Sequence, residues 1–408
     1  MIIPSIDLLD GRAVQLRGGR QQLLACLKDP LELAAEFNRY GEVAVIDLNA
    51  ATGKGTNLEL VKKLCRVADV RAGGGIRSKE RADELLRAGA RKIIIGSAAQ
   101  PEFLEQFPAA KIQVALDHSG GTVVDKGWSR STGEKVVERA QRLAPYCSSY
   151  LCTFVDREGS LQGLDAAAVA ELQERLPHPL TASGGISGTE NALEILALGA
   201  DLQVGTALYT GKLDLAAALI GTLAFEDNLL PTIVQETNGQ VLMLAYSSPE
   251  SLRLALLGGK GIYYSRSRRE IWEKGLTSGN SQDLVSCRAD CDSDALLFTV
   301  RQNGPACHTG SYSCFGSRRF NLHTLYDLLA RRRDNPPARS YTARLLSDPA
   351  YLKSKIMEEA REVVSSGDRG NLVWEIADLT YFLSVLAVKN GLSWQEITAE
   401  LGGRNKDK

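Results

Sequence analysis

The chain has 408 residues, enough for two to four domains, and its 48 basic and 49 acidic residues nearly balance. This balance argues against a broad positive surface that would attract nucleic acids or anionic membranes. No apolar run reaches membrane-spanning length, and the first residues do not resemble a signal peptide, so we expect a cytoplasmic protein without nucleic-acid or membrane partners. Four of the eight cysteines lie between positions 287 and 314, which favours a metal site over disulfides.

Residues 1–225 alternate short apolar runs, typical of buried parallel strands, with stretches that are apolar at helical spacing. This alternation fits a barrel or a doubly wound sheet. An internal repeat favours the barrel, because "GGGIRS" and Asp7 recur as "SGGISG" and Asp117 about 110 positions later. Two four-stranded halves of this size would close a (β/α)8 barrel.

The repeated residues suggest chemistry at the barrel mouth. Glycine pairs after strands let backbone N–H groups approach a phosphate, so two such pairs suit a substrate with a phosphate at each end. Asp7 and Asp117 end predicted strands, where one as base and one as acid would serve an isomerisation. Each feature alone could be a simple turn or a helix cap, but their duplication argues against that explanation.

The stretches "IPSIDLLDGRAVQL", "GGGIRS", "LDHSGGTVVDKGW", "TFVDREGSLQG" and "SGGIS" resemble the histidine-pathway isomerase that opens a phosphoribosyl-aminoimidazole aminal by an Amadori rearrangement. The resemblance implies Asp7 as general base, Asp117 as general acid and Thr153 as a supporting polar group. We expect the phosphate-binding residues to be Gly74, Gly75, Arg77, Gly96, Gly184, Gly185, Gly205 and Thr206. The chain departs from the family at "DLNAA" and at Glu158, which replaces an aspartate, so a barrel retained as a scaffold stays an alternative.

Residues 226–320 read as antiparallel strands or hairpins with glycine-bearing turns. Three aspartates occupy alternate positions and would repel one another without a cation such as magnesium: Asp290, Asp292 and Asp294. Three cysteines could bind zinc and leave one position open for a water molecule with a pKa of roughly 7: Cys291, Cys307 and Cys314. His308 could shuttle a proton. The alternative is buried cysteines beside a solvated aspartate loop.

The stretches "VQETNGQVLMLAYSS", "YYSRSRREIWEKGLTSGNSQ", "DCDSDALLFTV" and "ACHTGSYSCF" closely resemble phosphoribosyl-AMP cyclohydrolase over about 231–315. The resemblance implies zinc on the three cysteines, magnesium on the three aspartates and a site formed across a dimer interface. It also implies that four residues hold the phosphorylated substrate: Arg266, Arg268, Trp272 and Lys274. A core aromatic residue is the alternative for Trp272.

Residues 321–408 read as amphipathic helices. Five acids lie three or four positions apart on two of these helices: Glu358, Glu359, Glu362, Glu375 and Asp378. Two antiparallel helices could direct these acids to one point, where they would bind magnesium and, through it, a diphosphate. A charged solvent face is the alternative, but Glu375 and Asp378 lie in an apolar run, where unpaired acids are costly.

The stretches "SYTARLL", "KIMEEAREV" and "EIADLTYFLSVL" resemble phosphoribosyl-ATP pyrophosphohydrolase over about 321–405, with Glu359 and Glu362 as catalytic and Lys355 as substrate-binding residues. Together, the three resemblances imply consecutive steps of histidine biosynthesis on phosphoribosyl nucleotides. They also imply a homodimer formed through the second and third domains. Two other functions stay open: a structural or docking barrel beside two active domains, or a phosphoribosyl-ligand sensor with structural metals.

Overall fold

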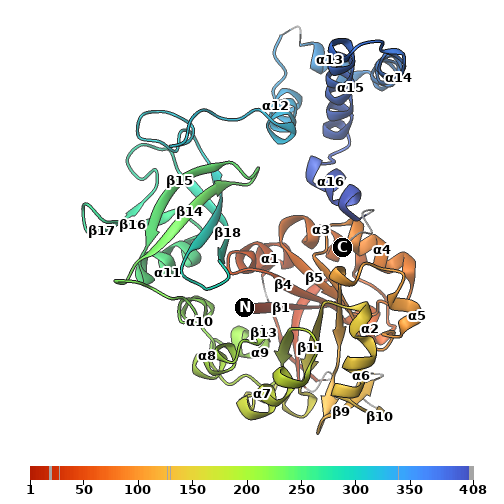
Figure 1. Cartoon of the computed structure of the whole chain (residues 1–408), viewed down its shortest axis with the longest axis vertical. Helices are drawn as coiled ribbons and strands as arrows, with labels where there is room; N and C mark the ends of the chain where they lie inside the picture. The colour runs from red at the N-terminus through yellow and green to blue at the C-terminus, as the bar shows by residue number, and fades with distance from the viewer. Residues whose placement is uncertain (18–20, 27, 126, 129, 339, 404–408) are drawn as a thin grey trace. The chain divides into compact units, whose positions relative to one another are not determined.

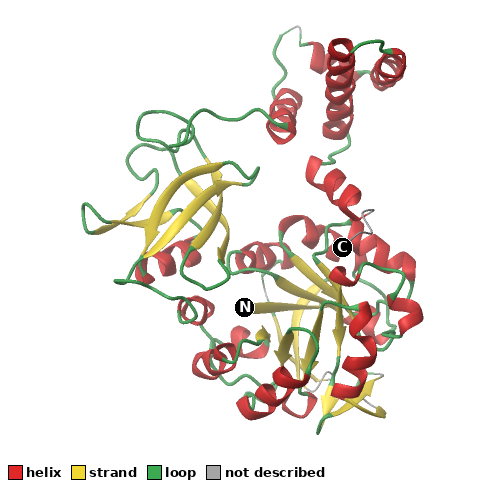
Figure 2. Ribbon diagram, viewed as in Figure 1, coloured by secondary structure: helices red, strands yellow, loops and turns green. Residues whose placement is uncertain are grey.

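The computed structural model describes residues 1–408 except 18–20, 27, 126, 129, 339 and 404–408. The described chain forms two compact units that divide after Gly316. The first unit contains a barrel and a smaller, mainly β domain, and the second is helical (Figures 1 and 2). The predicted fold class is confirmed. The domain boundaries 1–225, 226–320 and 321–408 stay predictions.

Eight parallel strands close the barrel. In order around it they are β1 (Ile2–Leu9), β4 (Val43–Asp47), β5 (Val70–Gly73), β6 (Lys92–Ile95), β7 (Ile112–Ala115), β11 (Ser149–Thr153), β12 (Leu180–Ser183) and β13 (Asp201–Val204). β13 pairs with β1, which closes the sheet. The strands are rich in buried Ile, Val and Ala, as strands covered on both faces must be. Each half of the sequence repeat supplies four of them, in agreement with the predicted duplication.

Helices surround the barrel. They are α1 (Pro30–Asn38), α3 (Leu58–Val67), α4 (Lys79–Arg87), α6 (Val136–Leu143), α7 (Ala166–Arg175), α8 (Thr189–Ala197) and α10 (Leu215–Ile220), with the shorter α2 (Leu48–Thr52), α5 (Pro101–Leu104) and α9 (Thr206–Tyr209) and the 3-10 turns η1 (Ala109–Lys111), η2 (Ala144–Tyr146) and η3 (Val155–Arg157). Two additions were not predicted. The hairpin β2 (Arg12–Arg17) and β3 (Gln21–Ala25) extends β1, and a small sheet of β8 (His118–Ser119), β9 (Thr122–Asp125) and β10 (Arg130–Lys135) follows β7.

The repeated glycines let neighbouring loops pack closely in both halves of the barrel. A Cβ on Gly74, where φ is +92°, would lie 2.4 Å from the carbonyl oxygen of Asp47. A Cβ on Gly184, where φ is +101°, would lie 2.7 Å from the carbonyl oxygen of Phe154. Only glycine combines that φ with that proximity. These glycines therefore have a packing role in addition to any contact with phosphate.

The mainly β domain has a four-stranded sheet in the order β15 (Val241–Ser247), β14 (Leu230–Glu236), β19 (Leu296–Gln302) and β18 (Gln282–Ala289), and a hairpin of β16 (Ile262–Ser265) and β17 (Glu270–Glu273). β14 runs parallel to β19, so the expectation of antiparallel strands is wrong for this pair. The long connection between them, which includes the unpredicted helix α11 (Pro249–Gly258), makes the parallel return possible.

The second unit consists of α12 (Leu322–Asp334), α13 (Tyr341–Ser347), α14 (Pro349–Ser365), α15 (Arg369–Lys389) and α16 (Trp394–Gly403). Its core is a cluster of apolar side chains: Leu329, Leu345, Leu352, Phe382, Val385 and Val388. Among the described residues, α15 alone is long and apolar enough to cross a membrane by length and composition. The expectation that no apolar run reaches that length is therefore wrong for α15, although core helices meet the same criterion.

We expect Gly184→Ala to destabilise the first unit by about 2–4 kcal/mol, because the added Cβ meets a backbone oxygen as well as an unfavourable φ. Gly199→Ala is the matched control, since Gly199 has φ +81° but no atom within 4 Å of an added Cβ. That variant should lose only about 1 kcal/mol. Denaturant unfolding measures both, and equal losses would contradict the packing role.

Candidate active sites

Two acids lie at the carboxyl ends of the barrel strands. Asp7 is in β1, where its Oδ1 accepts a 2.8 Å hydrogen bond from Ser5 Oγ. Asp117 follows β7, and its Oδ2 accepts a 2.8 Å hydrogen bond from Trp128 Nε1. Thr153, the last residue of β11, also hydrogen-bonds to the Asp117 carboxyl group. The three residues implied by the isomerase resemblance thus all occupy the end of the barrel where such folds place catalytic groups.

Burial keeps both acids less acidic than aspartate in water. It raises the pKa of Asp7 to about 6, although the hydrogen bond from Ser5 acts in the opposite direction. Burial likewise raises the pKa of Asp117 against the hydrogen bonds from Trp128 and Thr153. An acid with a pKa near the working pH can both accept and donate a proton, as an isomerisation requires.

A third carboxyl group, that of Glu158, lies within electrostatic reach of these two acids. Burial raises the pKa of Glu158 to about 7, and the negative charges of Asp7 and Asp117 add to the effect. In the sequence Glu158 stands out only as a departure from a motif. Its role could have been predicted from its place five positions after Thr153, because so short a segment keeps Glu158 near the end of β11, which lies at the barrel mouth.

The glycines of the second repeat line a pocket that could bind a phosphate, whereas Arg77 does not point into it. Gly184, Gly185, Gly205 and Thr206 line one small pocket, together with Glu158. Gly74 and Gly75 occupy the corresponding loop after β5, and Gly96 follows β6. Arg77 instead donates hydrogen bonds to the carbonyl oxygens of Ala50 and Ala51 in α2, so it holds a loop in this structure.

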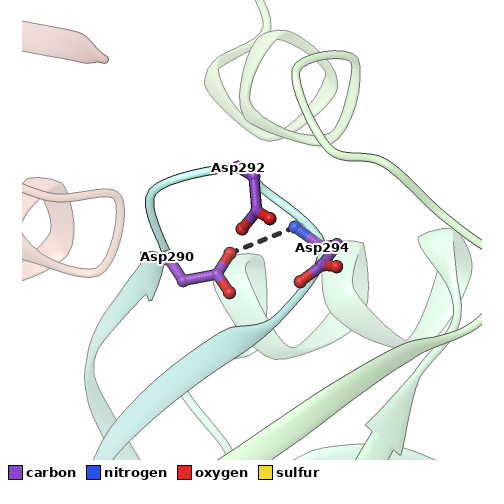
Figure 3. Close-up of side chains that lie close together, drawn as sticks. All are labelled: Asp290, Asp292 and Asp294. Carbon is purple, nitrogen blue, oxygen red and sulfur yellow. Dashed lines mark hydrogen bonds between the residues drawn. The ribbon is translucent and has the colours of Figure 1, made fainter.

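The three aspartates of the mainly β domain meet in the loop between β18 and β19. Their carboxylates point toward one another, with one oxygen of each within 4.8 Å of the others (Figure 3). Asp290 Oδ1 accepts hydrogen bonds of 3.1 Å from the backbone N–H groups of Asp294 and Ala295. The negative charges of Asp292 and Asp290 raise the pKa of Asp294. Hard oxygen ligands under mutual repulsion suit a divalent cation such as Mg²⁺.

The structure brings together two of the three predicted zinc ligands. The thiols of Cys307 and Cys314 interact with each other and with the charge of Lys274. Cys291 does not join them, because no group of three thiols within 4.8 Å occurs among the described residues; its Sγ instead lies 3.8 Å from Asp292 Oδ1. His308 lies beside the pair, with its Nδ1 3.9 Å from Cys307 Sγ. Two adjacent thiols suit zinc but do not complete a site.

The other predicted substrate contacts are spread over the hairpin. The Arg266 guanidinium stacks on Tyr246, 3.8 Å from the ring centroid. Arg268 lies 6.0 Å from the ring of Trp272. Trp272 is half-buried and packs against Tyr263, with centroids 5.4 Å apart, which matches its alternative as a core aromatic residue. Both guanidinium groups are exposed and able to meet a phosphate.

The helical unit gathers acids from α14 and α15. One oxygen each of Glu359, Glu375 and Asp378 lies within 4.8 Å of the others. Glu362 hydrogen-bonds to Glu375, and desolvation together with this neighbour raises the pKa of Glu375. Glu358 turns away to Lys355, whose Nζ lies 2.7 Å from it and 3.2 Å from Glu359. The set is therefore four acids, not the five named from the sequence, and it suits a divalent cation.

The fold and these clusters define a multidomain protein with a candidate active site in each domain. Residues 1–214 match the family described as "Histidine biosynthesis protein", residues 243–316 match "Phosphoribosyl-AMP cyclohydrolase" and residues 322–405 match "Phosphoribosyl-ATP pyrophosphohydrolase". The chain belongs to the histidine biosynthesis protein family, with the other two families represented in its C-terminal part. The three resemblances drawn from the sequence are confirmed.

Curated relatives match the chain over less than half of its length. The chain is 46% identical over 181 residues to "Histidine biosynthesis trifunctional protein" of Kluyveromyces lactis, which covers 44% of this chain and 23% of that protein. It is 43% identical over 195 residues to "Histidine biosynthesis bifunctional protein HisIE" of Thermotoga maritima, which covers 44% of this chain and 98% of that protein. The chain thus spans less than a quarter of the trifunctional relative and nearly all of the bifunctional one.

The raised pKa of Glu158 predicts a pH-dependent stability. The folded protein favours the protonated carboxyl group of Glu158. Its contribution to the free energy of unfolding is therefore fully present below pH 4.5, the ordinary pKa, and is lost as the pH rises to about 7. Glu158→Gln removes the cost of ionisation, so we expect it to stabilise the first unit by about 1–3 kcal/mol more at pH 8 than at pH 4. Denaturant unfolding at the two pH values measures the difference.

The exposed Glu174 gives the control Glu174→Gln, which should change the free energy of unfolding equally at both pH values. Equal behaviour of the two variants would contradict the placement of Glu158.

The helical cluster predicts which glutamates hold a cation. In a chain with Asp292→Asn to remove the loop site, Glu375→Gln should weaken Mn²⁺ binding by about tenfold or more, because it removes a ligand from the cluster. Glu358→Gln carries the same change in charge on a residue that is paired with Lys355, and it should have little effect. The electron paramagnetic resonance signal of free Mn²⁺ gives both affinities. Equal losses would show that only net charge matters.

Proposed function

We propose that the chain catalyses three consecutive steps of histidine biosynthesis on phosphoribosyl nucleotides. The helical unit hydrolyses phosphoribosyl-ATP to phosphoribosyl-AMP and pyrophosphate. The mainly β domain opens the adenine ring by hydrolysis, and the barrel isomerises the product by an Amadori rearrangement. The observation that supports this best is that each domain gathers its acids or thiols at one point. The prediction of a cytoplasmic enzyme without nucleic-acid or membrane partners is part of this proposal.

In the barrel, two acids divide the proton transfers. Asp117, held by Trp128 and Thr153, donates a proton to the ring oxygen of the aminated sugar as the ring opens. Asp7 then removes a proton from the sugar carbon next to the amine-bearing carbon, which gives the enol form of the ketone. Glu158, with a pKa of about 7, keeps a proton near both groups. The pocket at Gly184 and neighbouring residues binds one of the two phosphates of the substrate.

In the mainly β domain, Cys307 and Cys314 would hold zinc, which supplies a water molecule with a pKa of roughly 7 when bound. Since Cys291 is separate from them within one chain, we propose that the Cys291 of a second copy completes the set in a homodimer. The side chains of Ile233 and Leu244 pair across two neighbouring strands and are 42% and 54% exposed, which supports a dimer contact at this sheet. Magnesium on the three aspartates would hold substrate phosphate, and His308 would move the proton.

In the helical unit, Glu359, Glu362, Glu375 and Asp378 would hold magnesium, which binds a diphosphate and activates water when present. Lys355 lies beside this cluster and suits the negative charge of the substrate. Apolar side chains of α15 remain exposed in one chain, among them Val373 at 62% and Trp374 at 70%. We propose that α15 of a second chain covers them, which makes the helical unit the other contact of the homodimer.

The decisive experiment supplies phosphoribosyl-ATP with magnesium and zinc to the purified chain and identifies the products. We expect all three products in sequence. Asp117→Asn should lower the isomerisation by about 10²–10⁴-fold, as loss of a general acid does, while the two hydrolytic steps serve as internal controls and keep their rates. A parent chain that opens the ring but does not isomerise the product would favour a structural barrel, and isomerisation at an unchanged rate in this variant would contradict the role of Asp117 as general acid. No turnover of phosphoribosyl-ATP would favour a sensor with structural metals.

A further inference from the structure

The strand that leads into the aspartate loop is the edge strand of its sheet, and the barrel covers that edge. β18 ends the order β15-β14-β19-β18, so one side of it has no strand partner. The first half of β18 is bonded to its own domain, where Leu284 N donates to Gly259 O and Gly261 N donates to Gln282 O, both at 2.9 Å. The second half contacts α1 of the barrel.

Three contacts bind β18 to the barrel from Val285 onward. Cys287 N donates a 2.9 Å hydrogen bond to Arg39 O. Asn38 Nδ2 donates a 3.1 Å hydrogen bond to the carbonyl oxygen of Val285, where the pairing of β18 with β19 shifts register. The guanidinium of Arg288 forms an ion pair with Asp69. Backbone groups that an edge strand leaves open are thus satisfied by another domain.

The barrel side of this contact is itself firmly held. Asn38 is 4% exposed, and its Oδ1 accepts a 2.8 Å hydrogen bond from Asp69 N. The Asp69 carboxylate also pairs with Arg91 Nε at 2.7 Å. Asp69 directly precedes β5 and Asn38 ends α1, so both lie at the amino-terminal end of the barrel strands, opposite the acids of the mouth. Asn38 is buried, and Asn38 and Asp69 each hold more than one partner, which gives β18 a rigid support.

The chain segment between the two domains holds the loop from its other side. Ala224 N donates a 2.8 Å hydrogen bond to the carbonyl oxygen of Ser293, which lies between two of the aspartates and has φ +64°. Only Ala289 separates Arg288 from Asp290. The loop is therefore fixed at its start by the barrel and at its centre by the connecting segment.

We propose that the amino-terminal face of the barrel positions the cation site of the cyclohydrolase domain. Asp69 and Asn38 act as positioning residues: through β18 they fix the geometry of Asp290, Asp292 and Asp294, and the affinity for a divalent cation depends on them. This inference rests on the proposed metal site. It gives the barrel a second task that is independent of whether its own mouth is catalytic.

The test uses the full chain with Glu375→Gln, which weakens the helical site, and Mn²⁺ alone as probe. Arg288→Met breaks the ion pair to the barrel and should weaken Mn²⁺ binding by about tenfold, the lower end of losses for supporting partners of metal ligands. A direct charge effect would have the opposite sign, because removing a positive charge near the loop favours a cation. Arg288→Lys should recover part of the loss. Arg91→Met is the matched control, since Arg91 pairs with the same Asp69 but forms no hydrogen bond or ion pair with β18 among the described residues, and it should stay within about twofold of the parent.

Asp69→Asn approaches the same ion pair from the barrel and provides a second variant should Arg288→Met fail to fold. Binding in either folded variant that is as tight as in the parent, or tighter, would overturn the positioning role. A parent chain that binds no Mn²⁺ at the loop would instead overturn the proposed metal site itself, so the two failures are distinguishable. Thermal unfolding of each variant without metal shows whether a loss of affinity merely follows a loss of stability.

Discussion

The cost of keeping several neighbouring carboxylates charged, whether from burial or from mutual repulsion, is the constraint on which the proposed acid sites of all three domains depend. Such groups cannot all stay charged without a proton or a cation to neutralise them. In the barrel burial raises the pKa values of Asp7 and Glu158 to about 6 and 7, with repulsion from Asp7 and Asp117 adding to the rise at Glu158, so protons neutralise these acids. The loop aspartates are exposed and the helical acids only partly buried, and there a divalent cation is the natural counterion. In the proposed function, the same physical problem would lead to proton transfer in one domain and to metal chemistry in the other two.

The barrel has two ends with different proposed tasks. The acids lie at the carboxyl ends of the strands, whereas Asn38 and Asp69 bind the cyclohydrolase strand at the opposite end. Barrels of this fold usually have their catalytic groups at the carboxyl ends of the strands and residues important for stability at the opposite end. The contacts of the cyclohydrolase strand therefore lie at one end of the barrel, and the acids of the mouth lie at the other. The fusion would help by raising the local concentration of the shared intermediates, not by joining the sites.

Much of the fold follows from sequence patterns because those patterns have a direct physical cause. Buried strands require apolar runs, and the spacing between Asp7 and Asp117 reflects the duplication that closes the barrel. The parallel pairing of β14 with β19 could not be predicted, since alternation of side chains is the same in parallel and antiparallel strands. The separation of Cys291 from Cys307 and Cys314 and the turn of Glu358 toward Lys355 likewise depend on tertiary geometry and rotamers. Residue type indicated the chemistry, but it did not decide which side chains meet.

The number of divalent cations bound per chain tests the central claim most directly. Equilibrium dialysis of the full chain against Mn²⁺ at neutral pH should give two bound ions, one at the aspartate loop and one at the helical cluster, with the barrel mouth neutralised by protons. Chains that bind no Mn²⁺ at concentrations up to the millimolar range would contradict the account, because the two acid clusters would then tolerate their charge without a counterion.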